Sequence, residues 1–256
     1  MTQNIQKIAL VTGSSRGLGK HTALALAQKG VDVIVTYHMS EANANEVVSE
    51  IKAMGRNAIA LQLDSSDTQT FEALVERVKQ SLQDTWQTNG FDFLINNAGF
   101  GFNQPFIEIT EDRFDSLFNI NVKGVFFLTQ KLLPSINEGG HIVNISSGLA
   151  RFTLPGYSAY ASTKGAIEVL TRYLAKELGA RQIRVSVVAP GAIETDFGGG
   201  AVRDNQELNS FIASQTALGR VGVPDDIGGA IASLLSEDNR WINGQRLEVS
   251  DRKSVV

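Results

Sequence analysis

The sequence predicts a doubly wound α/β domain, in which a parallel sheet of about seven strands has helices on both faces. Short apolar runs alternate with helical patterns along the whole chain, which is the pattern of an α/β fold. The apolar runs are near-continuous, as strands are when both faces of a parallel sheet are covered. The chain has no linker, no shift in composition and no repeat of fixed period. We therefore expect residues 1–256 to form a single domain.

The first half of the chain contains four of the expected strands. Apolar runs predict strands at 7–12, 31–36, 57–63 and 91–95. The helical patterns between them cover a stretch from the glycine-rich segment at 13–19 to Gly30, then 41–54, then 67 to about 86. Gly30 and Gly55 follow the first two helices, where glycine commonly ends a helix.

The second half continues the alternation. One helix or two consecutive helices are expected at 111–136, and a longer one at 159–178. Strands are expected at 141–146, 183–188 and 245–249, with a further helix at 225–235. The glycine-rich stretch at 191–215 is expected to be irregular.

Composition excludes several classes of protein. The chain is 43% hydrophobic and 20% charged, with a net charge of -4, so it shows no electrostatic footprint for nucleic acid or an anionic membrane. No apolar run approaches the roughly 18 residues of a membrane helix, and the strand pattern at the N-terminus leaves no room for a signal peptide. Cysteine is absent, which removes disulfides and thiolate chemistry. Three scattered histidines offer no ligand spacing, so we expect a cytoplasmic, metal-free protein.

Five residues that often carry function fall at the ends of expected strands. They are Gly13, Asp64, Asn97, Ser147 and Pro190. In a doubly wound sheet, ligands bind beyond the carboxyl ends of the strands. We therefore expect these residues to mark a binding site rather than five unrelated turns.

The segment TGSSRGLG at 12–19 lies between the first strand and the first helix. Glycine permits a positive φ and lets a pyrophosphate approach the main chain, and the helix start offers free N–H groups and a positive dipole end. This predicts a dinucleotide loop, and the alternative is a glycine-rich turn without a ligand. The expected contacts are Gly13, Ser15, Arg16, Gly17, Leu18 and Gly19.

The end of the second strand predicts which dinucleotide is preferred. A carboxylate there would repel the 2′-phosphate of NADP, but Tyr37 and His38 follow Thr36 and no acidic residue precedes Glu41. Arg16 offers a guanidinium to the phosphate, although a solvated surface arginine is the simpler alternative. We expect NADP rather than NAD, with Tyr37 and His38 among the cofactor-binding residues.

Tyr160 and Lys164 are four residues apart where a helical pattern begins. Residues at i and i+4 share a helix face, so the phenol and the ammonium can point into the same space. A nearby cation favours phenolate, and the Ser147 hydroxyl offers a partner for a substrate oxygen. Tyrosine and lysine are both common, so the pair alone leaves chemistry and chance spacing open.

Five motifs occur in one order along the chain: TGSSRGLG, NNAG at 96–99, Ser147, YASTK at 160–164 and PGAIET at 190–195. Together they resemble the short-chain dehydrogenase/reductase family, and within it the 3-oxoacyl-(acyl-carrier-protein) reductase-like branch. The resemblance spans about residues 6–249 and implies a single-domain Rossmann fold. It also implies an NADP-dependent oxidoreductase acting on C=O and CH–OH groups.

The resemblance implies a role for each catalytic residue. Tyr160 would donate a proton to the carbonyl, and Ser147 would orient that carbonyl and stabilise its negative charge. Lys164 would bind the nicotinamide ribose and lower the pKa of Tyr160. Asn121 would hold a water of the proton relay, with Asn119 as the nearby alternative.

The resemblance also implies the remaining cofactor contacts. Asp64 and Ser65 would meet the adenine, and the residues after the fourth strand would line the adenosine side. These residues are Asn97, Ala98 and Gly99. At the other end, the nicotinamide carboxamide and the pyrophosphate would be held by Pro190, Gly191, Ile193 and Thr195. Asn96 is expected to tie strands together, and Ser146 to be a sheet-end hydroxyl.

Two further stretches shape the expected substrate site and assembly. We call 192–215 the lid segment, because glycines at 198–200 suggest a mobile cover; a floppy surface loop is the alternative. Tyr157 and the aromatic residues Phe102, Phe106, Phe152 and Phe197 are expected either to line the cleft or to pack in the core. The family usually ends in an apolar tail, but residues 250–256 are charged here, which puts that tail's part in a tetramer in doubt.

These expectations lead to a named function. We expect NADPH-dependent reduction of a 3-oxoacyl thioester, with an acyl-carrier protein as a partner that basic residues near the cleft would bind (Lys123, Lys131, Arg172 and Lys176). The alternatives are a broader ketone or secondary-alcohol oxidoreductase and a non-catalytic NADP-binding regulator or scaffold. The latter would be expected to lack Ser147, Tyr160 or Lys164, and all three are present. We expect a dimer or tetramer formed through the helices at about 113–136 and 159–178.

Overall fold

The computed structural model describes residues 6–251 and contains one seven-stranded sheet in the order β3-β2-β1-β4-β5-β6-β7. Every pairing between neighbouring strands is parallel, so the predicted fold class is confirmed. The strands are β1 (Ile8–Val11), β2 (Asp32–Tyr37), β3 (Ala58–Gln62), β4 (Phe91–Asn96), β5 (Ile136–Ile145), β6 (Arg184–Pro190) and β7 (Arg246–Val249). The strand order reverses between β1 and β4, which is where doubly wound sheets bind their ligands.

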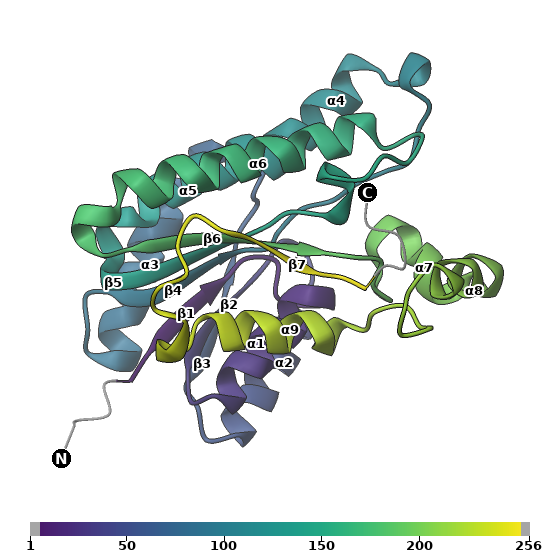
Figure 1. Cartoon of the computed structure of the whole chain (residues 1–256). Coiled ribbons are helices and arrows are strands. Elements are labelled where there is room, and N and C mark those ends of the chain that lie inside the picture. Colours follow the sequence, from purple (N-terminus) through teal and green to yellow (C-terminus); the bar gives the residue numbers. More distant parts are fainter. Residues whose placement is uncertain (1–5, 252–256) are drawn as a thin grey trace.

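Helices cover both faces of this sheet (Figure 1). On one face lie α1 (Gly17–Gln28), α2 (Glu41–Ala53) and α9 (Pro224–Leu234), and on the other α3 (Phe71–Trp86), α5 (Val125–Leu132) and α6 (Ser158–Glu177). The strands serve both layers by alternation: Ala9 and Val11 pack in the first layer, whereas Ile8 and Leu10 pack in the second. Burial on both sides is why the strands read as continuous apolar runs.

The helical stretch expected at 111–136 is divided in two by a wider turn. It contains α4 (Glu111–Phe118), a π-helical segment (Asn119–Gly124) and α5, and β5 already begins at Ile136. The expected helix end at 136 and strand start at 141 were therefore wrong. The π-helical segment packs closely on the chain after β3, because a Cβ on Gly124 would overlap the Ser65 carbonyl oxygen.

The lid segment is more regular than expected. It contains a 3-10 turn (Phe197–Gly200), a short α7 (Ala201–Asp204) and α8 (Gln206–Ser214). The prediction of an irregular stretch was wrong, because the three glycines break only the turn and Asn205 caps α8 by accepting from the Leu208 N–H at 3.0 Å. Figure 1 places α7 and α8 beyond the carboxyl ends of β6 and β7.

The predicted charged tail at 250–256 falls mostly outside the described residues. Within them, the Asp251 carboxylate accepts a hydrogen bond from the Leu218 N–H. None of the helices between residues 6 and 251 is long and apolar enough to cross a membrane.

Candidate active site

Tyr160 and Lys164 lie one turn apart near the start of α6 and share one face of the helix. Both are 6% exposed, and the Lys164 Nζ lies 5.5 Å from the centre of the Tyr160 ring. The helix therefore points a phenol and an amine into one shielded space beyond the end of β5. This is the arrangement that the i, i+4 spacing predicted.

Ser147 completes the group from the neighbouring strand. It lies two residues after β5, in extended conformation, and caps the 3-10 turn Gly148–Ala150 by accepting from the Leu149 N–H at 3.1 Å. Its hydroxyl also lies near enough to the Tyr160 hydroxyl to lower the pKa of that phenol. Three residues from two elements thus meet at the carboxyl edge of the sheet.

Burial sets the protonation of this group. It lowers the pKa of Lys164 to about 8, and the ammonium donates to the Ile145 carbonyl oxygen at 2.9 Å. Burial also raises the pKa of the Tyr160 phenol, against a smaller lowering by the bond to Ser147. Desolvation of the phenol is thus the largest influence on its pKa, and the lowering of this pKa by Lys164 stays a prediction.

Asn121 lies in the π-helical segment and is almost fully buried. Its amide donates to the Phe100 carbonyl oxygen at 2.9 Å and to the Thr163 hydroxyl at 3.2 Å, and its oxygen accepts from the Phe100 N–H at 3.2 Å. It therefore ties the segment after β4 to α6, the helix that carries Tyr160 and Lys164. Asn119, the alternative candidate, lines a cavity on the outer face of the helices instead.

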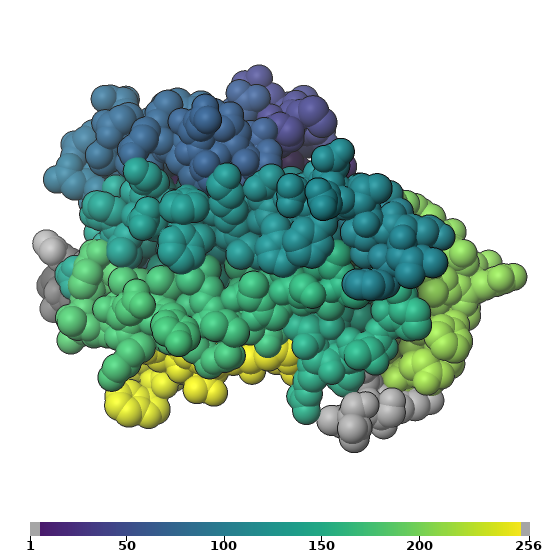
Figure 2. Space-filling model, turned by 90° about the horizontal axis from the view of Figure 1, so that it is seen from above, coloured from purple at the N-terminus to yellow at the C-terminus, as the bar shows by residue number. Residues whose placement is uncertain are grey.

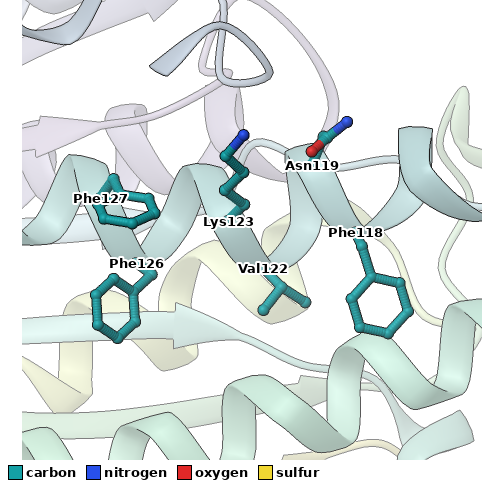
Figure 3. A pocket seen from close by; sticks show the side chains of 6 residues that line it. All are labelled: Phe118, Asn119, Val122, Lys123, Phe126 and Phe127. Carbon is teal, nitrogen blue, oxygen red and sulfur yellow. The ribbon is translucent and has the colours of Figure 1, made fainter. Parts of the chain in front are cut away.

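That outer cavity is apolar, and Ser147, Tyr160 and Lys164 are not among its lining residues. Its volume is about 390 Å³, and Figure 3 shows phenylalanine rings along its helix face. Its lining residues are Phe118, Asn119, Val122, Lys123, Phe126 and Phe127. We therefore treat it as part of the outer surface and not as the substrate site.

The glycine loop after β1 has the geometry of a phosphate site. Gly13 and Gly17 have φ values of 62° and 54°, and a Cβ on Gly19 would overlap the Gly13 carbonyl oxygen. The first N–H groups of α1 cannot be bonded within the helix, and Arg16 at its start gives no side-chain cap. A pyrophosphate fits such a cradle, so this structure can accommodate a dinucleotide there.

The ends of β1 and β4 are joined behind the loop. The Asn97 amide donates to the Thr12 carbonyl oxygen at 2.8 Å, and the N–H groups of Asn97 and Ala98 both donate to the Thr12 hydroxyl at 2.9 Å. Asn97 therefore uses its side chain to hold the loop. Gly99 must be small, because a Cβ there would lie 2.7 Å from the Asn121 Oδ1. Asn96 bonds Asn144 of β5 at 2.8 Å, which ties the strands together as expected.

Charged and polar side chains surround the expected adenosine end. The His38 Nε2 lies 3.4 Å from the Asp64 carboxylate, which accepts from the Ser66 N–H at 2.8 Å. Partial burial opposes ionisation of Asp64, but the Ser66 bonds and His38 outweigh it and lower the pKa of this carboxyl. Arg16 is largely exposed, with its Nη1 3.8 Å from the Asp196 carboxylate.

The segment after β6 faces the glycine loop. A Cβ on Gly17 would lie 4.0 Å from the Thr195 Cβ, and the Thr195 hydroxyl accepts from the Phe197 N–H at 3.1 Å. Ile193 forms a bridge with Gly222. Thr195 therefore lies next to the glycine loop, and the part of Pro190, Gly191, Ile193 and Thr195 in holding the nicotinamide end stays a prediction.

Aromatic rings surround Tyr160. The Phe197 ring centre lies 5.4 Å from that of Tyr160, and the Tyr157 ring centre lies 6.4 Å away. Phe102 packs in the same cluster, but Phe106 is 78% exposed. Two members of the cluster, Phe100 and Leu149, were not predicted. Their positions just after the NNAG motif and after Ser147 are the signals that identify them.

Comparisons with known proteins agree with this geometry. A family model described as enoyl-(acyl carrier protein) reductase matches residues 13–251. An uncharacterized oxidoreductase of Methylorubrum extorquens is 40% identical over 95% of this chain and 96% of its own. The tetrahydroxynaphthalene reductase of Pestalotiopsis fici is 36% identical over 95% of this chain and 90% of its own.

A solved structure is similar over nearly the full length. The angucycline C-6 ketoreductase with bound NADP is 33% identical, covers 96% of this chain and 95% of its own, and has a TM-score of 0.91. The chain therefore belongs to the short-chain dehydrogenase/reductase family. Because these relatives are reductases, the chain is an oxidoreductase that acts on C=O and CH–OH groups.

Proposed function

We propose that this chain reduces ketones to secondary alcohols with NADPH, and oxidises the alcohols with NADP. The observation that carries the proposal is that the buried Tyr160 and Lys164 share one helix face, with Ser147 beside the phenol. When bound, the nicotinamide cofactor supplies the hydride that the carbonyl carbon accepts. The protein supplies positioning, a hydrogen bond and a proton.

Tyr160 is the proton donor in this proposal. Because burial raises its pKa, the phenol keeps its proton at neutral pH. The substrate oxygen becomes alkoxide-like as its carbon gains the hydride, and an alkoxide is basic enough to take the phenol's proton. The Ser147 hydroxyl donates to the same oxygen and stabilises its growing negative charge.

Lys164 and Asn121 support this transfer from the side of the cofactor. The Lys164 Nζ would lie 3.7 Å from a Cβ on Gly99, so its ammonium borders the expected cofactor site, where we assign it to the ribose hydroxyls. Asn121 joins the segment after β4 to α6 at the same level. We assign it the water that resupplies the proton to Tyr160.

The choice of NADP over NAD rests on charge. No acidic residue stands at the end of β2 before Glu41, so the residues directly after this strand carry no carboxylate that would repel a 2′-phosphate. Arg16 and His38 are two basic side chains on this side of the site. The angucycline ketoreductase binds NADP, which supports the same choice here. We expect a higher kcat/KM with NADPH than with NADH, and the reverse order would contradict the assignment.

The proposed substrates are cyclic ketones with a flat apolar body. The rings of Tyr157, Phe197 and Phe102 around Tyr160 favour stacking on a planar molecule. The relatives named for tetrahydroxynaphthalene and angucycline reduction support this class. The second candidate is a 3-oxoacyl thioester on acyl-carrier protein; the description of the matching family model names an acyl-carrier protein, there with an enoyl group.

A direct assay separates these substrates. NADPH consumption would be followed with 2-tetralone, with acetoacetyl-coenzyme A and with a simple acyclic ketone such as 2-butanone. We expect the highest kcat/KM for 2-tetralone. A higher value for the thioester would select the second candidate, and no NADPH consumption with any ketone or thioester would contradict the proposed function.

The lid segment is proposed to open and close over the substrate. It carries Phe197, whose ring packs on Tyr160 and occupies space above the phenol. A Cβ on Gly101 would lie 2.6 Å from the Phe197 ring, so the two surfaces are in close contact. A substrate of the proposed size therefore needs Phe197 to move aside.

The proposed assembly is a dimer or tetramer through α4, α5 and α6. Figure 2 shows these helices side by side across one face of the molecule. Phe126 is 44% and Tyr173 65% exposed on this face, and the apolar cavity of Figure 3 lies on it. Such a patch is typical of an interface. Light scattering should give a multiple of the 27.6 kDa chain mass, and the mass of one chain would contradict the assignment.

A further inference from the structure

The edge strand β7 presents two charged side chains to a helix-covered face. Leu247 and Val249 pack against the layer that contains α1 and α9. Arg246 and Glu248 alternate with them and so point to the opposite face, on which Glu168 of α6 lies. Parallel strands buried under helices usually carry apolar residues on both faces. The position of Arg246 therefore calls for a specific explanation.

The guanidinium of Arg246 makes three different contacts. Its Nε donates to the Glu168 carboxylate at 2.7 Å, and its Nη1 donates to the Glu248 carboxylate. Its Nη2 donates to the backbone carbonyl oxygen of Ser147 at 3.0 Å. The same side chain thus joins an ion pair on the sheet face to the backbone of a residue in the active site.

Glu168 also binds Ser146, the residue before Ser147. The oxygen that binds Arg246 also accepts from the Ser146 hydroxyl at 2.6 Å. The ion pair therefore holds Ser146 by its side chain and Ser147 by its carbonyl. The side chains of Arg246 and Glu168 are only 19% and 15% exposed, so water competes little for these charge-assisted bonds.

The Ser147 carbonyl controls where the Ser147 hydroxyl lies. It also accepts from the Ala150 N–H at 3.1 Å, while the hydroxyl accepts from the Leu149 N–H at 3.1 Å. A carbonyl held from two sides cannot turn with its peptide plane, so the backbone at Ser147 is fixed. The hydroxyl is then held beside Tyr160, whose pKa it lowers.

We propose that Arg246, paired with Glu168, is a positioning residue that holds Ser147 in register with Tyr160 for reduction. This rests on the proposed function, because Ser147 matters to catalysis only if the chain reduces ketones. A residue that merely tied β7 to α6 would affect stability without changing the chemical step. The two roles therefore differ in what a substitution changes.

The first test is steady-state kinetics with NADPH and 2-tetralone. Arg246→Met should lower kcat by roughly tenfold to a hundredfold, because small misplacements of a catalytic group cost that much, while KM for NADPH stays within about twofold, since Arg246 lies away from the glycine loop. Arg246→Lys should recover only part of kcat, because an ammonium lacks the planar fork that reaches Glu168 and Ser147 together. Unchanged kcat in a folded Arg246→Met protein would overturn the proposal.

The matched control is Arg184, another shielded arginine that bonds a backbone carbonyl. It is the first residue of β6, at the edge of the sheet away from Ser147, and its Nη1 donates to the Asn239 carbonyl oxygen at 3.0 Å. Arg184→Met should lower the melting temperature without lowering kcat. An equal fall of kcat in both variants would show a general loss of packing and overturn the proposal. The double variant Arg246→Met/Glu168→Met serves if Arg246→Met does not fold, because it removes both partners of the Glu168 ion pair and leaves Glu248 paired with Arg151 at 3.6 Å.

The second test does not depend on turnover. Hydrogen exchange measured by mass spectrometry on the peptide covering 147–151 reports the amides of Leu149 and Ala150. These amides donate hydrogen bonds to the hydroxyl and to the carbonyl oxygen of Ser147. Arg246→Met should speed their exchange by about tenfold, the effect of losing one good hydrogen bond, and Arg184→Met should not. If the wild-type chain reduced no ketone, the proposed function would fail, and unchanged exchange in Arg246→Met would separately overturn the positioning role.

Discussion

The group of Ser147, Tyr160 and Lys164 and the lid segment touch where Phe197 packs on Tyr160, but they are held in different ways. Tyr160, Lys164 and Asn121 are almost fully buried, and their bonds reach several elements. The lid segment instead has three successive glycines with positive φ at 198–200. Its Asp196–Arg203 ion pair joins two side chains that are more than 40% exposed, and such pairs contribute about 0–1 kcal/mol.

This contrast suggests that the two regions have different roles. A fixed centre suits a proton donor, which must keep its geometry from one turnover to the next. A weakly held cover suits entry and release of substrates of different shape. Substitutions in the centre should therefore change the rate of the chemical step, whereas substitutions in the lid segment should change which substrates are accepted.

The largest effect is expected for Tyr160→Phe. This change removes the proton donor and leaves the ring, so kcat should fall by about a thousandfold or more. The dissociation constant for NADPH, measured by its fluorescence, should change little. Ser147→Thr is a milder comparison that keeps a hydroxyl. Substantial turnover in Tyr160→Phe would remove Tyr160 from its role.

Lys164 should give the next largest effect and a pH dependence. Lys164→Met should lower kcat/KM by about a hundredfold and weaken NADPH binding, since the ammonium is lost from the cofactor site. In the wild-type chain the pKa of Lys164 is about 8, so the charged form declines as pH rises through that value. NADPH binding should therefore weaken above pH 8, and the same profile in Lys164→Met would contradict this origin.

His141 lies in the fixed interior of the protein, and its expected effect is on the free energy of unfolding. Its ring is fully buried in β5 beside Ser186 and Arg184, and burial lowers its pKa to about 3. Unfolded chain binds the proton near pH 6.5, so stability is lost as pH falls from 6.5 toward 3. The loss is about 2 kcal/mol at pH 5.

Urea denaturation at pH 7 and pH 5 measures this loss. Replacing the ring by His141→Asn should reduce the difference in unfolding free energy between the two pH values. Equal differences in the variant and the wild-type chain would show that other groups cause the acid sensitivity.

The smallest effect is expected in the lid segment. Phe197→Ala should change kcat for 2-tetralone by only a few-fold, because the ring lines the cleft without taking part in proton transfer. KM for 2-tetralone should rise more than KM for 2-butanone, since the larger ketone loses the stacked surface. Phe211→Ala, on the exposed side of α8, is the matched control. A loss of kcat as large as that of Tyr160→Phe would break the division between centre and cover.

The sequence was most informative where a feature depends on neighbours along the chain. The alternation of apolar runs and helical patterns predicted the parallel sheet, and the spacing of Tyr160 and Lys164 predicted their common helix face. Strand ends brought Gly13 and Ser147 to the same edge of the sheet. These features follow from local periodicity and from the topology of an α/β fold.

Features that depend on distant contacts were not predicted. The π-helical segment is held by bonds of Asn121 to Phe100 and Thr163, which no local pattern encodes. The direction of the Tyr160 pKa shift depends on how completely the fold excludes water. Arg246 was missed because its partner Ser147 lies 99 residues away in the chain.

The central claim is tested most directly by following a deuterium atom. Wild-type protein and Tyr160→Phe would each be incubated with 2-tetralone and NADPH deuterated at the nicotinamide C4, and the alcohol analysed by mass spectrometry. The account predicts one deuterium at the carbinol carbon with wild-type protein and almost none with Tyr160→Phe, although both bind NADPH. Equal labelling by the two proteins would contradict it.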